Sequence, residues 1–146
     1  MVDVVTEIEI HRPRAVVAEF AADPENAPAW YSNIKAVSWE SSPPVAVGSR
    51  VAFKARFLGR TLAYVYEFTE LDPGRKLVMR TAQGPFPMQT TYTWADAGGG
   101  STRMTLRNTG TPAGFSAVAG LVMAPMMRRA MRKDLAKLKS LLEAGL

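Results

Sequence analysis

The sequence predicts an α+β fold in which an antiparallel sheet of six to seven strands is covered by one long C-terminal helix. Between residues 48 and 108, large apolar side chains recur at every second position, which is the spacing of half-buried strands. Residues 126–143 repeat their apolar side chains at helical spacing instead. A twisted antiparallel sheet with one apolar face needs a covering layer, and this helix is the only predicted element large enough to provide it. The length fits one domain, residues 1–146.

The N-terminal segment predicts one strand followed by two short helices. Residues 2–11 alternate between inward apolar and outward charged positions, as a half-buried strand does. Residues 14–22 have a short helical pattern. Asp23 and Pro24 are the residue types of a helix N-cap and a first helical position. We therefore expect a second short helix from this point, ending by Pro28.

The middle of the chain predicts the rest of the sheet. Six further strands are expected, at residues 33–40, 51–57, 62–69, 77–81, 86–94 and 102–108. The second and third of these form a hairpin, with Gly59 and Arg60 as a two-residue loop. In that register Phe53 faces Tyr66, and the apolar residues of both strands lie on the same face of the sheet.

The C-terminal helix is amphipathic and carries the net charge of the protein. Its apolar face is formed by Met127, Met131, Leu135, Leu138 and Leu142. Residues 126–139 hold six bases and the single acid Asp134, which accounts for the whole formal charge of +5. Pro125 should start this helix or kink it, and residues 115–124 should form a separate or bent turn.

The basic face of this helix has two interpretations. It is a solvated surface, or it makes a weak contact with an anionic membrane without inserting into it, through Arg128, Arg129, Arg132 and Lys133. A nucleic-acid-binding protein would more often spread its bases over a domain face, so no nucleic acid partner is expected. The oligomeric state, monomer or homodimer, stays open.

Several classes of site lack the residues that they need. The chain has no cysteine and one histidine, His11, whose position indicates an exposed strand end, so neither a metal site nor a cofactor is expected. A lone histidine without a placed acid and nucleophile is no catalytic signature. No stretch reaches the roughly 18 apolar residues of a membrane span. The N-terminus lacks the basic and apolar regions of a signal peptide, and a cytoplasmic location is expected.

The order of elements and several landmarks resemble the START/Bet v 1-like (SRPBCC) superfamily, and most closely its polyketide cyclase/dehydrase-type branch. The landmarks are "EIHRPRAVVAEFAADPENAPAW", "VGSRVAF", "YEFTELDPGRKL", "GPFPMQTTYTW", "GGGSTRMTL" and "RKDLAKLKSLLE". The resemblance covers nearly the whole chain. It implies a helix-grip fold, in which a curved sheet wraps around the last helix and leaves a deep cavity. Because this fold supports many functions, it does not select one of them.

The candidate site is the apolar face of the sheet together with the facing side of the helix. We expect a cavity lined by Phe53, Phe57, Tyr64, Tyr66, Met79, Thr81, Met88, Thr90, Tyr92, Trp94, Met104, Asn108, Met127 and Met131. The plain alternative is that these residues only fill a core. Buried tyrosine hydroxyls need partners, and in a cavity a ligand can provide them.

Three functions follow for such a cavity. The first is binding of a small hydrophobic molecule, aromatic or polyketide-like. The second, which the resemblance suggests, is a polyketide cyclase or dehydratase that folds a poly-keto chain, with Tyr64, Tyr66, Tyr92 or Asn108 polarising a carbonyl. The third is peripheral lipid binding or transport. No familiar catalytic motif decides whether the protein is an enzyme.

Overall fold

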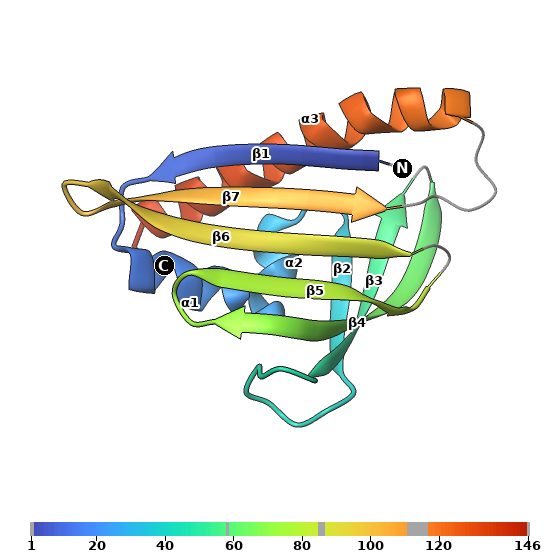
Figure 1. Cartoon of the computed structure of the whole chain (residues 1–146), viewed down its shortest axis with the longest axis horizontal. Coiled ribbons are helices and arrows are strands. Elements are labelled where there is room, and N and C mark those ends of the chain that lie inside the picture. Colours follow the sequence, from blue (N-terminus) through green and yellow to red (C-terminus); the bar gives the residue numbers. More distant parts are fainter. Residues whose placement is uncertain (1, 58, 85–86, 111–116, 146) are drawn as a thin grey trace.

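The computed structural model describes residues 2–57, 59–84, 87–110 and 117–145, and the side chains of residue 57 and of residues 117–122 are not described. The elements in chain order are β1 (Val2–Ile10), α1 (Arg14–Ala22), the 3-10 helix η1 (Pro24–Asn26), α2 (Ala27–Trp30), β2 (Ile34–Trp39), β3 (Arg50–Phe57), β4 (Arg60–Asp72), β5 (Lys76–Gln83), β6 (Met88–Gly98), β7 (Ser101–Gly110) and α3 (Ala117–Glu143). Seven strands form one antiparallel sheet in the order β1-β7-β6-β5-β4-β3-β2 (Figure 1). The predicted fold class is confirmed.

The sheet is curved, and α3 lies along one side of it beside β1 (Figure 1). The strand register shifts at four places, between Ile34 and Ala36, between Val65 and Tyr66, between Phe68 and Glu70, and between Asp96 and Gly98. Such irregularities bend a strand and increase its twist. The bends let the apolar face of the sheet wrap around the space beneath α3.

The β3–β4 hairpin has a different register from the predicted one. Phe53 pairs with Tyr64 and Phe57 pairs with Arg60, so the loop consists of residues 58 and 59. Gly59, at the second loop position, has the positive φ of 77° that glycine adopts without strain. The predicted pairing of Phe53 with Tyr66 is wrong by two residues. A shift of two keeps every side chain on its face, so the predicted apolar face is unchanged.

The second short helix continues further than predicted. The Asp23 side chain accepts a hydrogen bond from the backbone N–H of Glu25, as expected of an N-cap, and η1 follows. Helix α2 then runs past Pro28 to Trp30, so the predicted end at Pro28 is wrong. Pro28 lies in the first turn of α2, where a missing N–H breaks no intrahelical hydrogen bond. This extension buries Trp30 and places Tyr31 at the helix end.

Helix α3 is longer than predicted, because Pro125 lies inside it. Pro125 does not start the helix, and residues 117–124 are part of it, not a separate turn. The proline removes one backbone hydrogen bond from the helix, and on either side of it Met123 is buried and Met127 packs against the core. Further along, Leu135 and Leu138 are fully buried, as the amphipathic pattern predicts. Within the described ranges, no helix has the length and hydropathy needed to cross a membrane.

Candidate functional site

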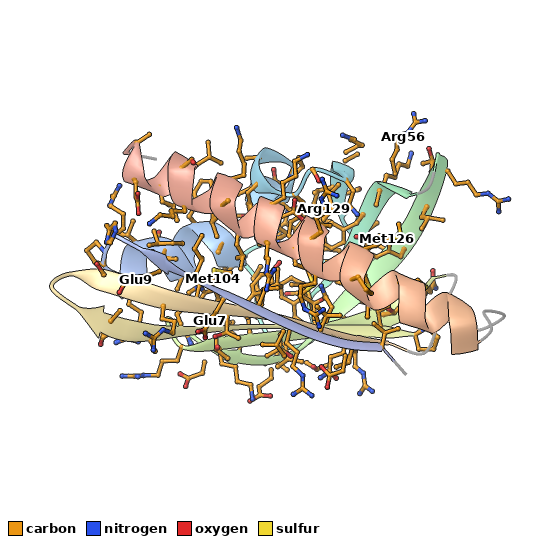
Figure 2. All side chains as sticks on the ribbon, turned by 90° about the horizontal axis from the view of Figure 1, so that it is seen from above. Glu7, Glu9, Arg56, Met104, Met126 and Arg129 are labelled. Atoms are coloured by element: carbon orange, nitrogen blue, oxygen red, sulfur yellow. The ribbon has the colours of Figure 1, made fainter. Side chains whose placement is uncertain are left out.

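A cavity of about 360 Å³ lies between the sheet and α3. Its walls come mainly from β3 to β7, from residues 31–34 after α2 and from the facing side of α3, with further contributions from Val2, Ala21, Ala22, Pro24 and Ala27. Figure 2 shows α3 lying across the sheet, with Met126 on the helix and Arg56 on β3. Both residues line the cavity and both are exposed. The opening therefore lies between α3 and the β3 side of the sheet.

Most of the predicted site residues are brought together here. Those that line the cavity are Phe53, Tyr64, Tyr66, Met79, Thr81, Met88, Thr90, Tyr92, Asn108, Met127 and Met131. The strand residues reach it because alternate side chains of a strand point to the same face, and the helix residues because they are spaced by four. The sequence pattern therefore identified the cavity wall, although not its volume.

Two predicted wall residues belong to the packed core instead. Trp94 and Met104 pair across β6 and β7 and are buried, but neither lines the cavity. Helix α1 packs against β6 and β7, the strands that carry these two residues. The alternation correctly predicts the face of the sheet on which Trp94 lies, but it does not predict which helix packs against that face. The side chain of Phe57 and the whole of Phe86 lie outside the described residues.

A chain of hydrogen bonds runs along the sheet side of the cavity. The Thr90 hydroxyl lies 2.6 Å from Oδ1 of Asn108 and donates to it. The hydroxyl of Tyr66 lies 3.2 Å from Thr90 Oγ1 and must therefore be the donor in that bond. The Thr81 hydroxyl is bonded to the backbone of Met88. These polar groups are thus largely used within the protein.

A second polar group includes residues that the sequence analysis missed. The hydroxyls of Tyr31 and Tyr92 lie 2.6 Å apart, and the carboxylate of Asp134 accepts a hydrogen bond of 3.0 Å from the backbone N–H of Ser32. Tyr31, Tyr92 and Asp134 all line the cavity. No periodic pattern marks Tyr31, which follows a very short helix. Asp134 could have been found, because at helical spacing it falls beside Met131 and Leu138 on the buried face of α3.

Burial controls the ionisation of these groups. It raises the pKa of Tyr31, Tyr64, Tyr66 and Tyr92 above the ordinary phenol value, so all four remain neutral hydrogen-bond donors near pH 7. Burial likewise raises the pKa of Asp134, although hydrogen bonds from Ser32 and the nearby charge of Lys133 act against it.

The histidine takes no part in the cavity. His11 is exposed, as expected, and its Nδ1 lies 3.0 Å from the Ser101 hydroxyl. In the described part of the chain, no group of three His, Asp or Glu side chains could hold a metal ion. The site therefore offers hydrogen-bonding groups and one carboxylate within an apolar wall.

The sequence family described as polyketide cyclase/dehydrase and lipid transport matches residues 1–143. The chain belongs to this family. No curated protein matches it in sequence. Family membership makes ligand binding or a cyclase role the relevant functions for the cavity, without naming the ligand.

Solved structures show the same fold at low sequence identity. The protein TTHA0849 from Thermus thermophilus is 19% identical, with a TM-score of 0.83 and coverage of 99% of both chains. The Zhui aromatase/cyclase from Streptomyces sp. R1128 is 15% identical, with a TM-score of 0.82 and coverage of 97% of this chain and 93% of that one. A START superfamily protein from Mycobacterium smegmatis is 15% identical, with a TM-score of 0.71 and coverage of 97% and 94%. The helix-grip fold of the START/Bet v 1-like superfamily is therefore confirmed.

Proposed function

We propose that the protein binds a small hydrophobic molecule, aromatic or polyketide-like, in the cavity beneath α3. The observation that carries the proposal is the cavity itself, about 360 Å³ in volume, with a largely apolar wall and neutral phenols as its main polar groups. A mostly apolar concavity with a few placed polar groups is the usual form of a small-molecule site. Membership of a family that includes polyketide cyclases supports the proposal.

The phenols favour a ligand that carries carbonyl oxygens. Tyr31 and Tyr92 have two hydroxyl hydrogens between them, and the bond that joins them uses only one. One phenolic hydrogen of this pair is therefore available to a guest. Tyr64 offers another, because its hydroxyl has no hydrogen-bond partner among the described residues and its side chain lines the cavity. Donors held in an apolar wall select ligands with acceptors at matching positions.

A matched pair of probes tests this proposal on the wild-type protein. The probes 2-acetylnaphthalene and 2-ethylnaphthalene have the same rings and similar size, but only the first has a carbonyl oxygen. We expect both to bind, and the ketone to bind roughly five- to tenfold more tightly, as a net gain of about 1 kcal/mol for one hydrogen bond predicts. Isothermal titration calorimetry measures both affinities. Failure of both probes to bind would overturn the proposal.

The second candidate function is a polyketide cyclase or dehydratase acting on a bound poly-keto intermediate. The neutral phenols favour it, because a phenol that donates to a carbonyl oxygen stabilises the negative charge that develops there during carbon–carbon bond formation. The fold shared with the Zhui aromatase/cyclase is consistent with such a role. Incubation with a synthetic poly-β-keto thioester tests it, with cyclised products identified by mass spectrometry. Product formation equal to that in buffer alone would argue against turnover.

A peripheral lipid contact is the third candidate. Met126 is 41% exposed at the cavity opening, and the neighbouring Arg129 and Lys133 are exposed on the same helix. An apolar side chain beside bases at an opening is a suitable surface for brief contact with anionic lipid.

A further inference from the structure

We propose that Asp134 selects, among the ligands of this cavity, those that present a hydrogen-bond donor, a hydroxyl or a protonated amine, at the position of its carboxylate. The inference rests on the proposed ligand-binding function and deepens it by naming a chemical feature of the ligand.

The carboxylate is buried and forms no ion pair with the described residues, although the charge of Lys133 lies near it. Asp134 is only 4% exposed, and it lies on the cavity-facing side of α3 with Met127, Ala130 and Met131. No lysine or arginine nitrogen of the described residues lies within 4.0 Å of it. Carboxylates are almost never fully buried unless they are paired. A buried Asp134 carboxylate without an ion-pair partner among the described residues therefore requires an explanation.

The carboxylate also has unused acceptor capacity. A carboxylate can accept about four hydrogen bonds. Ser32 is the only residue of the described chain that is hydrogen-bonded to Asp134, through its backbone N–H at 3.0 Å and through its side chain. Since Asp134 lines the cavity, the remaining acceptor sites are open to a guest.

The polar groups around Asp134 are hydrogen-bond donors, whereas Asp134 itself is an acceptor. Tyr31, adjacent in sequence to Ser32, forms the phenol pair with Tyr92, and the charge of Asp134 is close enough to raise the pKa of Tyr92. The phenols present donors and Asp134 presents acceptors, so a ligand with both a carbonyl and a hydroxyl or ammonium group matches both. A simple hydrocarbon would leave the carboxylate unpaired in an apolar wall, which is unfavourable.

The hydrogen bond between Asp134 and Ser32 does not require a negative charge on residue 134. An asparagine would keep an oxygen for the Ser32 N–H and would avoid the burial of a negative charge. The carboxylate is thus poorly suited as a merely structural residue. It is well suited to a bound donor, since hydrogen bonds to charged groups are stronger than neutral ones.

The experiment compares three naphthalene probes in three proteins. The probe 2-naphthol has a donor hydrogen, whereas 2-methoxynaphthalene keeps the oxygen and lacks that hydrogen. Their affinities are measured by calorimetry at pH 7 in the wild type, in Asp134→Asn, and in Asp72→Asn, which removes an exposed carboxylate at the end of β4 as a matched control. A third probe, 2-(aminomethyl)naphthalene, distinguishes an ammonium from a hydroxyl donor.

We expect the wild type and Asp72→Asn to bind 2-naphthol at least tenfold more tightly than the methyl ether, as a hydrogen bond to a charged group predicts. In Asp134→Asn the ratio should fall to about one or invert, because the amide N–H₂ now donates to the ether oxygen. Tighter binding of the amine than of 2-naphthol by the wild type and Asp72→Asn, but not by Asp134→Asn, would identify an ammonium as the preferred donor.

Two other results would distinguish failure of this inference from failure of the proposed function. If the naphthalenes bind but the ratio is the same in the wild type and in Asp134→Asn, the role of Asp134 is overturned and the proposed cavity function stands. If none of the probes binds any of the proteins, the proposed function fails and this inference fails with it.

Discussion

At the scale of single residues, the Tyr31–Tyr92 pair can donate one hydrogen bond to a ligand, and either tyrosine alone can still donate it. Their hydroxyls lie 2.6 Å apart, and only one of the two hydrogens is used between them. If one tyrosine becomes phenylalanine, the hydroxyl of the other loses its partner but keeps its own hydrogen for a ligand.

This geometry predicts a non-additive effect. Tyr31→Phe and Tyr92→Phe should each weaken the preference for 2-acetylnaphthalene over 2-ethylnaphthalene by less than twofold. The double variant should lose several-fold of it, corresponding to one hydrogen bond of about 1 kcal/mol. Tyr66→Phe is the control, because its hydroxyl hydrogen is already donated to Thr90. Additive losses in the two single variants would contradict the shared donor.

Asp134 makes a second prediction at this scale, on stability against pH. Burial raises its pKa in the folded chain above the unfolded value near 4. The folded state therefore holds the proton more tightly, so the stabilising contribution is present below the unfolded pKa and is lost as pH rises through the folded pKa. Asp134→Asn should melt at a higher temperature than the wild type at pH 8, and this difference should shrink towards pH 4. A difference that is constant across this range, in thermal melts followed by circular dichroism, would contradict the prediction.

At the scale of elements, α3 has two faces with different roles. Its inner face holds the buried leucines and the methionines of the cavity, and its outer face holds exposed bases. In the described part of the chain, only Lys139 among the bases of α3 forms an ion pair, with Glu143. The remaining charge of this face is therefore available to an anionic surface.

The outer face predicts a weak, charge-dependent contact with membranes. Arg129→Ala/Lys133→Ala should bind vesicles of phosphatidylcholine and phosphatidylglycerol about thirtyfold less tightly than the wild type, because each base contributes about 1 kcal/mol near such a surface. The matched control is Arg80→Ala/Arg103→Ala, which removes the same charge from exposed positions on β5 and β7. Vesicle co-sedimentation at low salt measures the difference. Equal losses in the two double variants would mean that net charge, and not α3, determines the contact.

At the scale of the whole molecule, the cavity exists because one helix cannot fill the space enclosed by seven strands. Helix α1 packs against β6 and β7, whose residues Trp94 and Met104 are buried in the core, whereas residues of β3, β4 and α3 line the cavity. The volume of the cavity therefore depends on how the sheet and the helices pack against each other.

Filling this volume should remove binding without harming the fold. Ala55 is buried and lines the cavity from β3, whereas Ala63 is exposed on β4. Ala55→Leu should weaken the binding of 2-acetylnaphthalene by tenfold or more and leave the melting temperature unchanged or raised, because the added carbons occupy empty space. Ala63→Leu should leave the affinity unchanged. A strong loss of stability in Ala55→Leu would show that the wall at this point is already packed.

Much of the architecture could be predicted from the sequence, because alternation and helical spacing are local properties of the chain. These patterns place Phe53, Tyr64 and Thr90 on the cavity face without any information on strand pairing. They could not set the register of the β3–β4 hairpin, since a shift of two residues gives the same alternation.

Local patterns along the chain specify which side chains face inward, the amphipathic character of the last helix and the location of the net charge. The packing of the layers, by contrast, places Trp94 and Met104 in the core, brings Tyr31 against Tyr92, and buries Asp134 against the cavity without an ion pair among the described residues. These features differ in the separation along the chain of the residues that cause them. The direction of a side chain depends on its near neighbours in sequence. A void, a hydrogen bond between distant residues and the burial of a charge depend on how separate layers come together.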